Sequence, residues 1–178
     1  NTGLSINGSS FDANYVQSSS GDRKGAVIFS GSGTQISIDS TSFENHITAQ
    51  DGGVIYTSGN LDISNSTFDN SESSSSGGVV YISGDLNIDG TQISNSSAGG
   101  SGGVIYNSSG NSTFNNTDIS VSSSGSSGAV LYAAANGNQA ELSSVNINNS
   151  SAFSIGGAIW TDGDITMYDS SIDSSSSN

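Results

Sequence analysis

The stretch Gly52-Gly-Val-Ile-Tyr56, followed by Leu61-Asp-Ile63 and Thr67-Phe68, contains every part of a unit that recurs along the chain. Its glycine step, Gly-Gly or Gly-Ala before three apolar residues, occurs six times, starting at Gly25, Gly52, Gly77, Gly102, Gly128 and Gly156. Successive first glycines are 27, 25, 25, 26 and 28 residues apart. A nearly constant period of this length indicates a solenoid, whose repeats bury their apolar faces by stacking on one another.

A second pattern lies between the glycine steps, with two apolar residues two positions apart and a third five residues later. It occurs seven times, twice loosely, starting at Leu4, Ile36, Leu61, Leu86, Ser112, Ala140 and Ile165. Side chains two apart share one face of a strand, so the pattern predicts short strands, whereas helical spacing is absent and glycine interrupts every window. We therefore predict an all-β, right-handed parallel β-helix of about seven rungs, each of about 25 residues and three short strands.

The whole chain, residues 1–178, is expected to form one β-helix domain. It opens and closes within a repeat, and neither end carries an amphipathic cap. An uncapped parallel coil exposes unpaired backbone groups. We therefore expect either an uncapped segment of a longer array or the building block of a filament.

The net charge of the chain limits the kinds of molecule that it can bind. The chain has 16 Asp and Glu residues against two Lys and Arg, for a net charge of −14. Binding to nucleic acid or to an anionic membrane surface needs basic residues, so neither is expected. No apolar run approaches the length of a membrane span, and the absence of cysteine excludes disulfide bonds.

One aromatic residue ends each glycine step at the same phase: Phe29, Tyr56, Tyr81, Tyr106, Tyr132 and Trp160. Two orientations are open at this point. Inward rings would belong to the core and leave a modest outward row of Val or Ile. Outward rings would form a hydrophobic stripe along the rod, which would mark a protein interface or bind sugar rings.

Polar residues also recur in phase. Asparagine stands two residues after the third apolar position in four repeats, at Asn45, Asn70, Asn95 and Asn149. Stacked asparagines are expected to hydrogen-bond along the rod and to adopt the left-handed turn conformation. Acidic residues precede this position at Asp12, Glu44, Asp69 and Asp173. Stacked like charges repel, so they are expected to be solvated or bridged by a cation, for which Ca²⁺ is the candidate. We assign no cofactor or specific metal site.

Two kinds of surface residue are candidates for glycosylation. N-glycosylation sequons begin at Asn7, Asn65, Asn95, Asn107, Asn111, Asn115, Asn148 and Asn149. Serine tracts precede most glycine steps, at Ser18–Ser20, Ser73–Ser76, Ser122–Ser124 and Ser174–Ser177. We expect the tracts to gather along one edge, either as tolerant turns or as an O-glycosylated stripe.

Catalytic signals are sparse. His46 is the single histidine; we place it on a polar turn, without the second His or Cys that a metal or nucleophilic site needs. Two carboxylate pairs, Asp85 with Asp89 and Asp162 with Asp164, are conceivable for glycoside hydrolysis. We predict that the protein is not an enzyme and keep a carbohydrate-binding or carbohydrate-cleaving β-helix as the alternative.

The repeat resembles those of chlamydial polymorphic membrane proteins and related bacterial surface β-helix adhesins. Gly156-Gly-Ala-Ile159 matches their first motif and Phe11-Asp-Ala-Asn14 their second, while Phe43-Glu-Asn-His46 and Phe68-Asp-Asn-Ser71 place the Asn one residue early. The resemblance implies an extracellular or cell-surface β-helix that serves as a stalk, adhesin passenger or self-assembling filament. Its expected partners are further copies of itself, a host or neighbouring surface protein, or a glycan.

Overall fold

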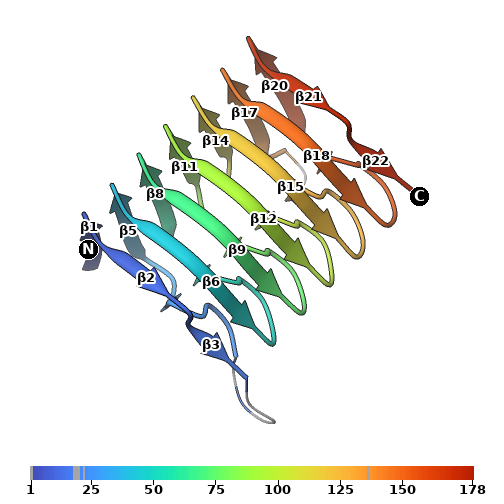
Figure 1. Ribbon diagram of the computed structural model, residues 1–178. Coiled ribbons are helices and arrows are strands. Elements are labelled where there is room, and N and C mark those ends of the chain that lie inside the picture. Colours follow the sequence, from blue (N-terminus) through green and yellow to red (C-terminus); the bar gives the residue numbers. More distant parts are fainter. Residues whose placement is uncertain (1, 18–20, 22, 136) are drawn as a thin grey trace.

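The structure, a computed structural model, describes residues 2–17, 21, 23–135 and 137–178. In these residues it is all-β, and the strands of successive repeats lie side by side along a rod (Figure 1). Three parallel sheets of seven, six and nine strands run along the rod. The predicted parallel β-helix with three strands per rung is therefore confirmed.

The strands of each sheet follow one another in chain order. The seven-stranded sheet contains β1 (Thr2–Asn7), β5 (Thr34–Asp39), β8 (Asn60–Ser64), β11 (Leu86–Asp89), β14 (Ser112–Asn115), β17 (Gln139–Ser143) and β20 (Asp164–Tyr168). The six-stranded sheet contains β4 (Ile28–Ser30), β7 (Ile55–Thr57), β10 (Val80–Ile82), β13 (Ile105–Asn107), β16 (Leu131–Ala133) and β19 (Ile159–Thr161). The nine-stranded sheet contains β2 (Ser10–Asp12), β3 (Tyr15–Val16), β6 (Ser42–Thr48), β9 (Thr67–Ser73), β12 (Gln92–Ala98), β15 (Asp118–Ser124), β18 (Asn146–Ala152), β21 (Ser171–Asp173) and β22 (Ser176–Ser177).

The apolar template sets the register between rungs. Ile38 pairs with Ile63 and Ile63 with Ile88, while Phe43 pairs with Phe68 on the nine-stranded sheet. All five side chains are at most 1% exposed, so they form the core between the sheets. The rings of Phe43 and Phe68 stack with centroids 4.7 Å apart. Each core position therefore packs against its own counterpart in the neighbouring rungs.

Left-handed backbone recurs at two positions of each rung, one in the middle of the nine-stranded sheet and one at a corner between sheets. The asparagine position and its counterparts have φ between 51° and 59° at Ala13, Asn45, Asn70, Asn95, Val121, Asn149 and Ser174. A second left-handed row, which the sequence analysis missed, separates the seven- and nine-stranded sheets with φ of 47° to 58° at Gly8, Ser40, Asn65, Gly90, Asn116, Ser144 and Asp169. Gly, Asn, Asp and Ser share this second row, and no single residue type marks it.

The glycine step forms the corner between the nine-stranded and the six-stranded sheet. Its first glycine has positive φ in every copy, 71° at Gly77, where an added Cβ would lie 2.2 Å from the Val80 carbonyl oxygen. The second glycine lets rungs approach, because a Cβ on Gly78 would lie 2.0 Å from the Gly103 carbonyl oxygen of the next rung. The first glycine is therefore required by its backbone conformation and close contacts, whereas the second position also accepts alanine, at Ala26 and Ala129.

Replacing one first glycine tests this account. We expect Gly77→Ala to lower the free energy of unfolding by about 2 kcal/mol or more, because it combines left-handed strain with a backbone clash. Gly31→Ala is the matched control, since an added Cβ there meets no atom within 4 Å. Urea unfolding followed by circular dichroism measures both. Equal stability of the two variants would contradict the assigned role of Gly77.

Candidate functional site

The aromatic residues of the glycine steps point outward from the six-stranded sheet. In β7, Tyr56 is half-buried between Ile55 and Thr57, both of which are fully buried. The same alternation recurs in β10, β13 and β16. Phe29 at one end is 58% exposed. Of the two orientations that the sequence left open, the structure shows the outward one.

The outward rings form a continuous stack, here called the aromatic ladder. Centroid separations between consecutive rings are 5.3, 4.9, 4.8, 5.0 and 4.3 Å, and interplanar angles do not exceed 15°, for Phe29, Tyr56, Tyr81, Tyr106, Tyr132 and Trp160. Both faces of each internal ring are covered by the two neighbouring rings. A sugar stacks on the face of an aromatic ring, so only the two ends of the ladder offer such a surface.

The valines of the four internal glycine steps, Val54, Val79, Val104 and Val130, are buried and are not part of this outer surface. Val54 is fully buried, like Ile55 beside it. The N–H groups of both residues donate to the same acceptor, the Val79 carbonyl oxygen, at 2.9 and 3.0 Å. This shared acceptor bends the backbone so that two consecutive side chains enter the core. In β7, β10, β13 and β16 the aromatic residue is therefore the one strand residue that reaches the surface.

Charge is distributed unequally over the three sheets. No strand of the six-stranded sheet contains a charged residue. Acidic residues lie on strands of the other two sheets, at Asp12, Asp39, Glu44, Asp62, Asp69, Glu72, Asp89, Asp118, Glu141, Asp164 and Asp173. Lys24 lies beside the aromatic ladder, with Nζ 4.5 Å from the Tyr56 ring centroid.

Partial burial raises the pKa of Tyr81 and of Tyr106, so both rings stay neutral at physiological pH.

Four carboxylates that directly precede a left-handed residue accept a hydrogen bond from an amide of the next rung. In each case the donor is an asparagine at the left-handed position one rung further along. The contacts are 2.7 to 2.9 Å long and join Asn45 to Asp12, Asn65 to Asp39, Asn95 to Asp69 and Asn116 to Asp89. These amides, with Ser64 and Ser94, lower the pKa of Asp39 and of Asp69.

Among the described residues, the predicted ladder of asparagine side chains is therefore reduced to a single amide-to-amide hydrogen bond. Asn70 Nδ2 donates to Asn45 Oδ1 at 2.8 Å, while Asn95 donates to a carboxylate instead. Within the described residues, no group of three or more His, Asp or Glu side chains is close enough to hold a metal ion. At Asp12 and Asp69, for which solvation or a bridging cation was predicted, an asparagine amide donates to the carboxylate.

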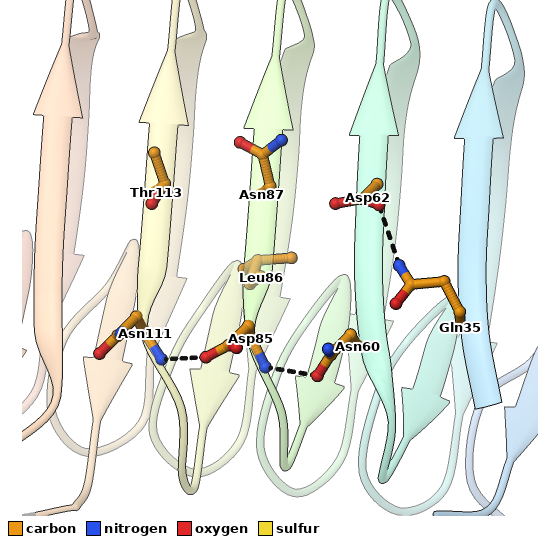
Figure 2. Close-up of a pocket in the computed structure, with 8 residues that line it drawn as sticks. All are labelled: Gln35, Asn60, Asp62, Asp85, Leu86, Asn87, Asn111 and Thr113. Atoms are coloured by element: carbon orange, nitrogen blue, oxygen red, sulfur yellow. Dashed lines mark hydrogen bonds between the residues drawn. The ribbon is translucent and has the colours of Figure 1, made fainter. Parts of the chain in front are cut away.

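A shallow depression on the outside of the seven-stranded sheet gathers polar side chains from four rungs (Figure 2). It is lined by Gln35, Asn60, Asp62, Asp85, Leu86, Asn87, Asn111 and Thr113. Asn60 Oδ1 accepts from the Asp85 N–H at 3.0 Å, and Asp85 Oδ1 accepts from the Asn111 N–H at 2.9 Å. Gln35 Nε2 donates to Asp62 Oδ2 at 2.9 Å. Most of these polar groups thus join neighbouring rungs.

The first of the two proposed carboxylate pairs does not have a glycosidase geometry. Asp85 and Asp89 are four residues apart along an extended chain, about 13 Å, whereas glycosidase carboxylates lie about 5 to 9.5 Å apart. Asp89 also accepts the Asn116 amide. Asp162 and Asp164 flank Gly163 and are both exposed.

The placement of His46 on a polar turn is wrong. His46 lies within β6 and is fully buried, because the left-handed Asn45 turns the next side chain back into the core after Phe43. Its Nδ1 accepts the Asn14 N–H at 3.2 Å, and its Nε2 has no hydrogen-bond partner. Burial lowers the pKa of His46, against the opposite influence of Asp12. Serine occupies this buried position in the following rungs, at Ser71, Ser96, Ser122 and Ser150.

The sequons differ in accessibility. Asn107 is fully buried, and its Nδ2 donates to Gly110 O at 3.1 Å and Ser112 Oγ at 2.9 Å, so a glycan there is incompatible with this packing. Asn115 and Asn148 are half-buried. The exposed sequon asparagines are Asn7, Asn65, Asn95, Asn111 and Asn149.

The serine tracts alternate between exposed and buried residues. Ser73, Ser122 and Ser124 face the interior, and Ser74 and Ser123 face outward. The tract at Ser174–Ser177 is exposed, while Ser18–Ser20 lies outside the described residues. A glycosylated stripe would therefore use only every second serine within a strand.

No family model, curated protein or solved structure matches the chain. In the part of the chain that the structure describes, there is no helix with the length and apolarity to cross a membrane.

The buried histidine predicts a pH dependence. The unfolded chain binds a proton near the ordinary His pKa of 6.5, whereas the folded chain resists it because the pKa of His46 is lowered. Its contribution to stability is complete above pH 6.5 and is lost as the pH falls through 6.5 toward the folded pKa. We expect the urea midpoint to fall between about pH 7.5 and about pH 5.

His46→Ser provides the matched control, because serine already occupies the same buried position in four other rungs. Carboxylate titration is common to both proteins, so the difference between their pH profiles isolates the histidine. Identical profiles for the two would show that His46 is not desolvated in the folded protein.

Proposed function

We propose that the chain is a structural rod segment of an extracellular or cell-surface assembly, acting as a stalk, adhesin passenger or filament subunit. The observation that carries this proposal is how the polar side chains are used. The carboxylates and amides of the outer ladders hydrogen-bond from rung to rung, as Asn95 does with Asp69 and Gln35 with Asp62. Side chains occupied in this way maintain a rod rather than reacting with a substrate.

The neutral face supports lateral association. Two copies with a net charge of −14 repel when their acidic sheets approach. The six-stranded sheet has no charged residue on its strands and exposes the edges of the aromatic ladder. Aromatic residues are enriched and charged residues depleted at the centres of interfaces. We assign this face to contact with a second copy or a neighbouring surface protein.

Carbohydrate binding is the second candidate. The depression on the seven-stranded sheet favours it, because its amides, carboxylates and Thr113 hydroxyl are groups that hydrogen-bond sugars. The covered ring faces of the aromatic ladder count against it. Glycan arrays combined with reducing-sugar assays distinguish the candidates. Binding abolished by Asn87→Ala, or release of reducing sugar, would replace the structural role with this one.

Sedimentation velocity over a range of concentrations tests the lateral contact. We expect association that weakens in a Tyr81→Thr, Tyr106→Thr double variant, which keeps strand-forming residues but removes two ring edges. A Thr67→Ser, Gln92→Ser variant on the exposed side of the nine-stranded sheet is the control and should associate like the parent. A protein that stays monomeric, or equal association of all three, would overturn the assignment of this face.

A further inference from the structure

The aromatic ladder is also a continuous pathway of oxidisable rings. Four tyrosines and one tryptophan follow one another from Tyr56 to Trp160 without interruption, at centroid distances of 4.3 to 5.0 Å. Phe29 extends the stack beyond Tyr56, but its ring has no hydroxyl and resists one-electron oxidation. The oxidisable part of the ladder therefore has two defined ends.

We propose that the aromatic ladder carries one-electron oxidising equivalents along the rod, between Trp160 and the tyrosines as far as Tyr56. Near-parallel rings in contact provide direct π overlap at every step. This activity does not depend on the proposed role in a surface assembly. It requires only the ring order and spacing of a single chain.

The chemistry balances at each step. A small inorganic radical, acting as a one-electron oxidant, removes an electron from the Trp160 indole. The indole then releases its N–H proton to water and becomes a neutral radical. That radical takes an electron and a proton from Tyr132, restoring the indole and leaving a phenoxyl radical. The phenoxyl radical takes an electron and a proton from the Tyr106 hydroxyl in the same way. A solution reductant that donates a hydrogen atom ends the sequence.

The environment of the hydroxyls suits this proton movement. The internal rings are half-buried with their edges at the surface, so a phenolic proton can reach water. The Tyr81 hydroxyl hydrogen-bonds with Ser108, whose Oγ lies 2.5 Å from Ser83 Oγ. No carboxylate lies on the strands that carry the ladder. The tyrosine sites still differ, because Lys24 lies over the Tyr56 ring and the charge of Asp51 adds to burial in raising the pKa of Tyr81 and of Tyr106.

Pulse radiolysis with the azide radical tests the first step, because this radical oxidises indole in preference to phenol and Trp160 is the single tryptophan. We expect the indolyl absorption to decay as the phenoxyl absorption grows, at a rate independent of protein concentration. Tyr132→Phe should abolish this phase while keeping the stack, since Phe29 already stacks in the ladder at 5.3 Å. Circular dichroism checks that the variant folds.

Tyr168→Phe is the matched control, because Tyr168 is exposed and lies on β20 of another sheet. It should leave the unimolecular phase unchanged. Loss of the phase in Tyr168→Phe, its persistence in Tyr132→Phe, or purely bimolecular decay in the parent would each overturn the proposal.

Transfer beyond Tyr132 needs a second readout. A nitroso spin trap followed by peptide mass spectrometry should find adducts on tyrosines from Tyr132 to Tyr56 in the parent. In Tyr106→Phe the adducts should be confined to Tyr132. Equal labelling of Tyr56 in the two proteins would show that the trap reports direct oxidation and would contradict transfer along the ladder.

Discussion

The structure depends on the in-register pairing of each rung with the next through parallel backbone hydrogen bonds. Pairing of this kind places every side chain beside its own counterpart, about 4.8 Å away. Apolar residues satisfy this constraint by packing, as Ile38, Ile63 and Ile88 do. Aromatic residues satisfy it by stacking, inside at Phe43 and outside at Tyr81. Acidic residues do not satisfy it unaided, because like charges then face one another.

The protein relieves this repulsion with asparagine. Four carboxylates that precede a left-handed residue accept a hydrogen bond from an asparagine side chain of the next rung, as Asp69 does from Asn95. One residue type thus serves two purposes, since asparagine tolerates the left-handed backbone and its amide also stabilises the neighbouring carboxylate by donating a hydrogen bond. The acidic residues that lie within strands are all on the other two sheets, so no strand of the six-stranded sheet carries a carboxylate. The proposed contact face and the proposed electron path both follow from that separation.

The fold and register could be predicted from the sequence because the apolar residues keep phase over seven repeats. The direction of Tyr56 could not, since three consecutive apolar residues are ambiguous until the shared acceptor at Val79 O turns both Val54 and Ile55 inward. The burial of His46 was missed for a related reason, because the left-handed Asn45 interrupts the alternation of faces. Each carboxylate–amide pair joins a carboxylate to an asparagine that stands one repeat position later in the next rung. Comparing residues at the same repeat position therefore does not detect these pairs.

The distance between identical phases several rungs apart tests the in-register stacking most directly. Gln35 and Gln139 are both exposed, and four pairings separate them through Asn60, Asp85 and Asn111. In this cysteine-free chain, Gln35→Cys and Gln139→Cys accept one spin label each. Four rungs place the two backbones about 19 Å apart, so pulsed electron paramagnetic resonance should give a single narrow distribution near that value. A broad distribution, or one centred well beyond it, would contradict the stacked solenoid.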